Sequence, residues 1–244
     1  MHLTWLDPHN DNQPFPHPDR ALTEPDGLLA AGGNLTPRRL LRAYRMGIFP
    51  WYSADQPILW WSPDPRLVLL PECLKVSRSL RKTLRKRVFT ITADTAFKQV
   101  VAACAGPRQG EPGTWITSEM YRAYCRLHRL GHAHSIETWQ QGELVGGLYG
   151  VALGQVFYGE SMFSWISDAS KIALVALTAQ LQRWEFAVID CQVTTAHLLS
   201  MGAVDIPRSS FLQLLERYCP QPGQPGPWRL DADLLDSLFA GARP

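Results

Sequence analysis

Cysteine is scarce in this sequence, and no two cysteines form a close pair. The 244 residues contain five cysteines, at positions 73, 104, 125, 191 and 219. An odd number without any C-x-x-C spacing argues against a disulfide framework and against a zinc knuckle. We therefore expect a protein of the reducing cytoplasm.

Long apolar runs and a large net charge are also missing. No segment approaches the roughly 20 apolar residues that a membrane span requires, and residues 1–8 lack the basic flank and apolar stretch of a signal peptide. We expect no membrane partner. The formal net charge is only +2, so any affinity for nucleic acid must come from a local cluster of basic residues. With 45% hydrophobic residues, the chain can bury one core, or one core and a smaller satellite domain.

One segment, residues 75–87, concentrates basic side chains and contains no acid. Val76, Leu80 and Leu84 recur at helical spacing, which predicts a helix with basic exposed faces. The basic residues on those faces are Arg78, Arg81, Lys82, Arg85 and Lys86. Such a stripe is often only a solvated surface. The concentration of basic side chains in one segment of a nearly neutral chain favours contact with a phosphate backbone. Such contact would not read the nucleotide sequence.

Three neighbouring histidines do not have the spacing of a metal site. Gly131 ends the helix that carries His128, so His132 and His134 do not share its face. The sequence also lacks an H-E-x-x-H pattern. We expect no bound metal.

Prolines at positions 63, 65 and 71 mark the expected domain boundary. Before it, Thr36 and Pro37 predict the start of a helix that Gly47 ends. The aromatic-rich stretch at residues 48–66 either lines a binding site or joins two domains. We expect a small N-terminal α+β domain at residues 1–66 and a larger domain at residues 67–244.

The larger domain predicts a mixture of strands and helices. We expect strands at residues 89–92, 135–139, 143–151, 156–163 and 187–193, and helices at 95–104, 118–130 with Ser118 as the cap, 171–184, 196–199 and 211–219. Glycines 146, 147 and 150 lie inside a strand, which indicates a bulge and a close backbone approach. This order of elements favours an α+β or α/β fold.

Two carboxylates and one amide stand in otherwise apolar strand segments. They are Glu160, Asp190 and Gln192, and burying such groups without partners costs about 1–3 kcal/mol each. Strand alternation predicts Asp190 and Gln192 on one face, with Cys191 packed on the other. These three polar residues are therefore the first candidates for chemistry, and a satisfied buried polar network is the alternative.

Many small acyltransferases share this order of elements. Those that use coenzyme A carry [Arg/Gln]-x-x-Gly-x-[Gly/Ala] before the helix that binds the pyrophosphate. Nothing in residues 140–175 fits that pattern. We expect no coenzyme A, so an acyl group would have to arrive on another carrier.

Seven blocks of sequence carry a specific resemblance. They are GIFPW at 47–51, WWSPDPR at 60–66, GTWIT at 113–117, GHAHS at 131–135, LVGGLYG at 144–150, GESMF at 159–163 and IDCQ at 189–192. In order and spacing, from about residue 15 to residue 211, the chain resembles the leucyl/phenylalanyl-tRNA–protein transferases. Two positions depart from the pattern: Asn34 stands where Asp is usual, and Trp165 where Arg is usual.

The resemblance implies an enzyme that moves Leu or Phe, and weakly Met, from aminoacyl-tRNA to the N-terminal Arg or Lys of a protein. The product would be an N-degron that marks the protein for degradation. The implied fold is α+β, a small N-terminal domain plus a C-terminal acetyltransferase-like (GNAT-type) mixed sheet flanked by helices. A coenzyme-A-dependent acetyltransferase and a non-catalytic tRNA-binding protein are the rival interpretations.

We hypothesise roles for three residues from the chemistry of ester aminolysis, whereas the roles of the basic helix and the pocket wall follow from the resemblance. Gln192 would contact the incoming amine or the ester carbonyl. Asp190 would orient Gln192 and draw off positive charge. Glu160 would pair with the acceptor's Arg or Lys side chain. The basic helix would bind the acceptor stem of the tRNA. The implied wall of the aminoacyl pocket, each member of which could equally be ordinary core, comprises Trp51, Tyr44, Trp115, Tyr124, Leu148, Phe157, Leu177 and Ile189.

Overall fold

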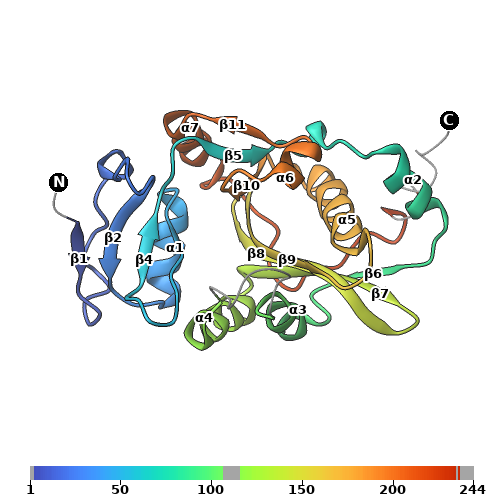
Figure 1. Cartoon of the computed structure of the whole chain (residues 1–244), viewed down its shortest axis with the longest axis horizontal. Helices are drawn as coiled ribbons and strands as arrows, with labels where there is room; N and C mark the ends of the chain where they lie inside the picture. The colour runs from blue at the N-terminus through green and yellow to red at the C-terminus, as the bar shows by residue number, and fades with distance from the viewer. Residues whose placement is uncertain (1–2, 107–115, 235, 237–244) are drawn as a thin grey trace.

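The structure, a computed structural model, describes residues 3–106, 116–234 and 236. Its N-terminal part is a four-stranded sheet with the order β1-β2-β4-β3, seen at the left of Figure 1 with helix α1 beside it. The elements are β1 (Thr4–Leu6), β2 (Leu28–Gly32), α1 (Pro37–Arg45), β3 (Phe49–Pro50) and β4 (Leu59–Trp61). As predicted, the Thr36 side chain caps α1 by accepting a hydrogen bond from the backbone N–H of Arg39.

A seven-stranded sheet with the order β11-β5-β10-β9-β8-β7-β6 forms the rest of the framework. Its strands are β5 (Arg66–Leu69), β6 (Thr90–Ala93), β7 (Ala133–Gln140), β8 (Glu143–Leu153), β9 (Val156–Ser164), β10 (Val188–Gln192) and β11 (Val204–Ile206). Neighbouring strands run antiparallel except β9 and β10, which pair in parallel from Val188 opposite Val156 to Asp190 opposite Tyr158. The sheet is therefore mixed.

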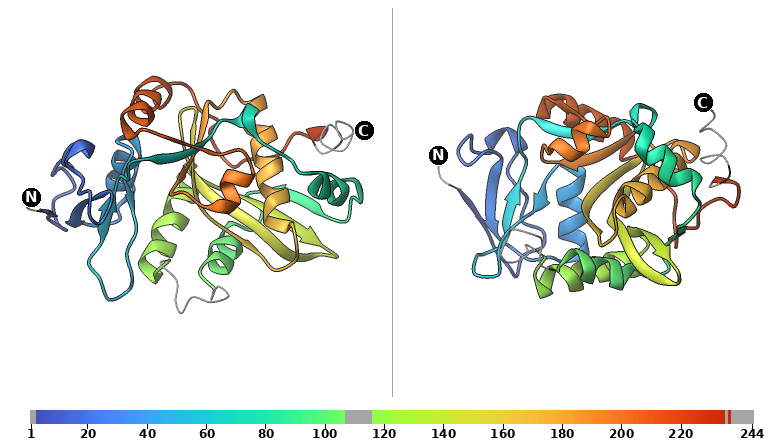
Figure 2. Two further views of the ribbon diagram at one scale, coloured as in Figure 1. Left: turned by 45° about the horizontal axis from the view of Figure 1, so that its top comes forward. Right: turned by 45° about the vertical axis from the view of Figure 1, so that its right-hand side comes forward.

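Helices cover both faces of this sheet. Helix α5 (Ala169–Arg183) packs on one face, and α3 (Phe97–Cys104) and α4 (Ser118–Arg129) pack on the other. Helix α2 (Arg78–Arg85) packs against α5. Helices α6 (Ala196–Ser200) and α7 (Arg208–Tyr218) come after β10 in the sequence. The rotated views of Figure 2 show the same layers. The predicted class, α+β with a small N-terminal part and a mixed sheet flanked by helices, is confirmed.

The glycines of β8 allow other backbone to come close. A Cβ on Gly146 would lie 2.5 Å from the Cβ of Ala169 in α5, and one on Gly150 would lie 2.2 Å from the carbonyl oxygen of Tyr158. The strand itself carries an extra residue, Val145, where its register against β7 shifts between Thr138 and Trp139. The predicted bulge and close approach are both present.

Several local predictions need correction or stay open. Thr117, and not Ser118, caps α4, because its hydroxyl accepts the backbone N–H of Met120. Strand β5 was not predicted, and it opens with Arg66, the last residue of the predicted N-terminal domain. The division at residues 66 and 67 stays a prediction. Among the described helices, none combines the length and apolarity that crossing a membrane takes.

Candidate active site

Two β-bulges at the same level of neighbouring strands shape the site. In β9, Gly159 lies opposite Gly150 and Ser161 opposite Tyr149, which makes Glu160 the extra residue. In β10, Asp190 lies opposite Val68 and Gln192 opposite Leu67, which makes Cys191 the extra residue. Bulges of this kind re-aim side chains and end regular pairing. Here they bring Glu160 and Gln192 together, with 2.9 Å between Oε1 of Glu160 and Nε2 of Gln192.

The predicted alternation along β10 is therefore wrong beyond Asp190. The bulge and a left-handed backbone at Gln192, with φ of 64°, turn the Gln192 side chain toward the same cavity as Ile189 and Cys191. Asp190 is not among the described residues that line this cavity. A period-two pattern cannot anticipate an inserted residue.

Glu160 is held by donors from three different elements. The hydroxyl of Tyr44 (α1) donates to Oε1 at 2.7 Å, the hydroxyl of Tyr124 (α4) donates to Oε2 at 2.5 Å, and the Gln192 amide donates to Oε1. Only 8% of Glu160 is exposed. Burial raises the pKa of its carboxyl to about 7, against the opposing effect of the two tyrosine hydrogen bonds.

Asp190 is completely buried and forms a two-pronged ion pair with Arg66. Nε of Arg66 donates to Oδ1 at 2.8 Å and a terminal nitrogen donates to Oδ2 at 2.7 Å. Oδ1 also accepts the backbone N–H of Gln192 at 2.9 Å. Sequence reasoning missed Arg66, although an arginine that opens the apolar strand Arg66–Leu69 was a visible signal.

An apolar cavity of about 460 Å³ opens beside these residues. Five members of the predicted wall line it, namely Trp51, Leu148, Phe157, Leu177 and Ile189, and Met162 and Leu174 join them without having been predicted. Glu160, Gln192 and Cys191 also face the cavity. Its volume lies in the range of small-molecule sites.

Three predicted wall residues do not line the cavity or cannot be placed. Tyr44 and Tyr124 are outside the set of described lining residues, because their hydroxyls are directed at Glu160. Trp115 lies outside the described residues. Cys191 was predicted to pack, and burial raises the pKa of its thiol, which disfavours a thiolate nucleophile.

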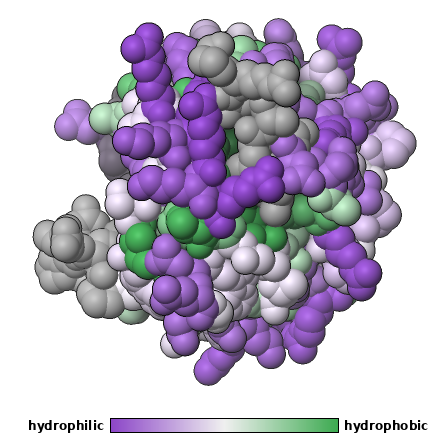
Figure 3. Space-filling model, turned by 90° about the vertical axis from the view of Figure 1, so that its right-hand side faces the viewer, coloured by the Kyte–Doolittle hydropathy of each residue, from purple (hydrophilic) through white to green (hydrophobic). Residues whose placement is uncertain are grey.

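The basic segment forms α2, and all five predicted residues of that segment are exposed. Leu80 and Leu84 are buried against the core, and Ser77 caps the helix. Figure 3 looks onto the end of the molecule where α2 lies: hydrophilic residues dominate this face, and a band of hydrophobic residues crosses it. This placement is compatible with contact to an extended polyanion.

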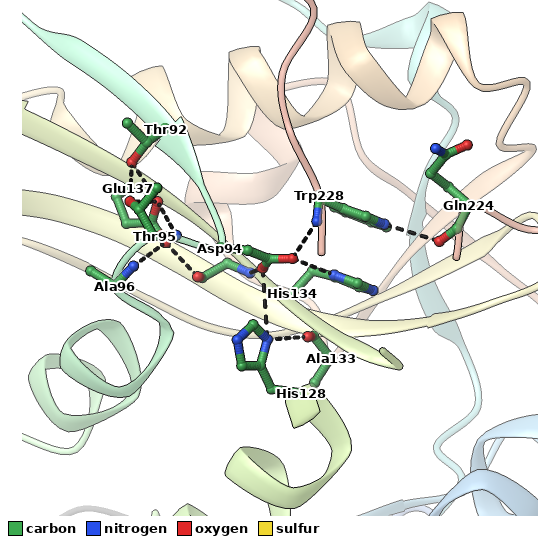
Figure 4. A network of polar contacts seen from close by, with 11 residues as sticks. Thr92, Asp94, Thr95, Ala96, His128, Ala133, His134, Glu137, Gln224 and Trp228 are labelled. Carbon is green, nitrogen blue, oxygen red and sulfur yellow. Dashed lines mark hydrogen bonds and ion pairs between the residues drawn. The ribbon is translucent and has the colours of Figure 1, made fainter. Parts of the chain in front are cut away.

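The histidines belong to a different network, shown in Figure 4. Nδ1 of His134 lies 2.8 Å from Oδ2 of Asp94, and Nδ1 of His128 lies 2.8 Å from the carbonyl oxygen of Ala133. Asp94 also accepts the backbone N–H groups of Ser135 and Trp228. Within the described residues, no three metal-binding side chains converge as a metal site would need.

Known proteins are similar in sequence to this chain over nearly its full length. Residues 68–216 match the family model described as leucyl/phenylalanyl-tRNA protein transferase, and residues 33–64 match its N-terminal domain. A leucyl/phenylalanyl-tRNA–protein transferase from Aromatoleum aromaticum is 60% identical over 93% of this chain and 94% of its own length. The chain belongs to the leucyl/phenylalanyl-tRNA–protein transferase family. A relative with the same name from Methylococcus capsulatus is 56% identical over 93% of this chain and 97% of its own length.

As a member of this family, the chain is an aminoacyltransferase that uses a tRNA donor and a protein acceptor. Solved structures resemble it more distantly. A GCN5-related N-acetyltransferase from Kribbella flavida is 13% identical over 69% of this chain and 60% of its own, with a TM-score of 0.33. A conserved protein of unknown function from Staphylococcus epidermidis is 12% identical over 74% of this chain and 68% of its own, with a TM-score of 0.41. Scores this low carry no argument about activity.

Proposed function

We propose that this family member moves Leu or Phe, and Met weakly, from aminoacyl-tRNA to the N-terminal Arg or Lys of proteins in the cytoplasm. The product is an N-degron. One observation carries the proposal: an apolar cavity of about 460 Å³ has a buried carboxylate and an amide on its wall. The apolar part suits the donor side chain, and the carboxylate suits a basic acceptor.

The apolar part of the cavity supports the acceptance of apolar amino acids and predicts limited selectivity among them. A polar side chain placed against Leu148, Phe157 and Leu177 would lose its hydration there without a hydrogen bond from these three residues. A difference of a methylene or two is worth only about 1–3 kcal/mol. Weak use of Met follows from this arithmetic.

The reaction is aminolysis of an ester. The acceptor's neutral α-amine attacks the ester carbonyl carbon, a C–N bond forms, the C–O bond to the terminal ribose breaks, and the ribose hydroxyl leaves with a proton while the amine loses one. The ester is already activated, so positioning can contribute about 7–11 kcal/mol of the barrier reduction. An α-amine with a pKa near 7.7–8.0 is roughly one-tenth neutral at pH 7.

Gln192 is placed to contact the amine. Its Nε2 is engaged with Glu160, which leaves the side-chain carbonyl oxygen as an acceptor for an amine N–H. Asp190 acts on the position of Gln192 through the backbone N–H. Glu160, when ionised, is the partner for the cationic side chain of the acceptor.

Helix α2 contacts the phosphates of the tRNA acceptor stem through Arg78, Arg81, Lys82, Arg85 and Lys86. Its exposed basic side chains support binding that weakens with salt and depends little on tRNA sequence. Neither a metal nor coenzyme A is required by the ester chemistry.

The test uses purified protein, labelled Leu-tRNA and a peptide that begins with Arg, without ATP, added metal or coenzyme A. We expect Leu-Arg-peptide, and no product from the same peptide beginning with Glu. Retention of charged tRNA without product would support a binding protein instead. Turnover of acetyl-coenzyme A with the same peptide would support an acetyltransferase.

A further inference from the structure

Arg66 is a buried cation that connects the N-terminal part of the chain to strand β10. It is 1% exposed, and its guanidinium lies 4.7 Å from the ring centres of both Phe49 and Phe211. One terminal nitrogen donates to the carbonyl oxygen of Gly47 at 3.1 Å. Phe49 itself lines the cavity, so Arg66 contacts one wall of the site from behind.

The same guanidinium fixes Asp190 through two parallel hydrogen bonds. Such a planar pair restrains the carboxylate in orientation as well as position, which a lysine at one contact point would not do. Because Asp190 is fully buried, no solvent is available to replace the guanidinium as a partner. The orientation of the carboxylate therefore depends on Arg66.

Asp190 in turn holds a strained backbone. Gln192 has φ of 64°, a conformation that costs a non-glycine residue on the order of 1 kcal/mol or more and persists only when its surroundings impose it. The Asp190 carboxylate accepts the Gln192 N–H at the point where the bulge breaks the ladder to β5. The side chain of Gln192 reaches Glu160 from this conformation.

We propose that Arg66 is a positioning residue for aminoacyl transfer. It holds Asp190, and through Asp190 it holds the left-handed backbone of Gln192, so that Gln192 and Glu160 face the cavity together. Arg66 is not among the described lining residues, so it acts through others and does not touch the reacting atoms. The proposal rests on the roles proposed above for Gln192 and Glu160.

The first experiment compares Arg66→Lys with Arg39→Lys in steady-state transfer from Leu-tRNA to an Arg-starting peptide. Arg39 is an apt control because it is also 1% exposed and also lies over an aromatic ring, that of Phe15, while its described side-chain hydrogen bond goes to the carbonyl oxygen of Asn10. We expect Arg66→Lys to lower kcat by about 10²-fold, the cost of misplacing a reacting group by about 1 Å, with little change in either KM. Arg39→Lys should keep kcat per folded molecule, with thermal melting reporting the folded fraction.

A double-mutant cycle separates positioning from general stability. If Arg66 acts through Gln192, adding Arg66→Lys to Gln192→Ala should lower kcat no further. Multiplicative losses, or wild-type kcat in Arg66→Lys alone, would overturn the proposal. If Gln192→Ala itself keeps full kcat, the roles proposed for the site fail instead.

A milder variant serves if Arg66→Lys does not fold. Phe211→Leu removes one of the two rings against the guanidinium and keeps the ion pair. A folded Phe211→Leu variant should show a smaller loss of kcat that again disappears in the Gln192→Ala background. Unchanged kcat in that folded variant would count against a role for Arg66.

Discussion

Two buried carboxylate networks occupy the same sheet, and they differ in what surrounds them. Asp94 accepts two backbone N–H groups and faces His134, and its neighbour Glu137 accepts threonine hydroxyls and the backbone N–H of Ala96. Neither carboxylate lines the large cavity. Glu160 accepts only side-chain donors in the described structure, and it faces the cavity.

The difference predicts that the Asp94 network is structural and that Glu160 belongs to a site. Asp94, at the end of β6, accepts backbone N–H groups from β7 and from the segment at Trp228 (Figure 4). These hydrogen bonds satisfy the carboxylate and are sufficient reason for its burial. Glu160 has a pKa raised to about 7 by burial and a cavity in front of it, a combination typical of functional carboxylates. Burial alone does not indicate a role in chemistry, whereas burial beside a cavity makes Glu160 the candidate.

Replacing Gln192 gives the largest expected effect. Gln192→Ala should lower kcat by about 10²–10³-fold, the cost of losing one preorganised hydrogen-bonding group at a reacting centre. Asp190→Asn should act in the same direction by releasing Gln192. Both should retain aminoacyl-tRNA in filter binding, which separates transfer from donor affinity. Normal turnover in both variants would contradict the roles proposed for Gln192 and Asp190.

The pH dependence of stability should distinguish Glu160 from an ordinary carboxylate. Its pKa is raised from 4.5 to about 7 in the fold, so the native state binds the proton more tightly than the unfolded state. The stabilising contribution is complete below pH 4.5 and is lost as the pH rises through 7, on the order of 3 kcal/mol. Urea unfolding of wild type and Glu160→Gln across this range measures it, and parallel curves would contradict it.

Replacing Asp94 should change stability and leave chemistry alone. Asp94→Asn loses a charged acceptor for the Trp228 and Ser135 N–H groups, which should lower the free energy of unfolding by about 1–3 kcal/mol. Because the network does not reach the cavity, kcat per folded molecule should stay at the wild-type value. A large loss of kcat with native stability would erase the contrast between the two networks.

Local patterns in the sequence predicted much of the fold because periodicity and capping are local properties. The cap at Thr36, the strand glycines and the basic helix followed from nearby residues. The site was only partly predictable. Glu160 and Gln192 were identified because they are polar residues in otherwise apolar strand segments. Their meeting depends on bulges at Glu160 in β9 and Cys191 in β10, and the period-two pattern of these strands does not mark where the extra residue is inserted.

Partners distant in the sequence were the main omission. Arg66 and Asp190 are separated by 124 positions, and Tyr44 meets Glu160 across 116. The resemblance assigned Tyr44 and Tyr124 to an apolar wall, because an aromatic ring is as suitable for an apolar wall as for the surroundings of a carboxylate. Only the positions of their hydroxyls show that they hold a carboxylate.

Charge removal on α2 gives the smallest expected effect and tests a surface that belongs to neither network. Lys82→Gln with Lys86→Gln should raise the KM for aminoacyl-tRNA and reduce the slope of log affinity against log salt by about 2, since each phosphate contact contributes roughly 1. The matched control replaces Arg122 and Arg126, two exposed residues of α4, with Gln. Because α2 residues do not line the cavity, kcat at saturating donor should be unchanged. Equal salt slopes in the two double variants would mean that α2 is only a solvated surface.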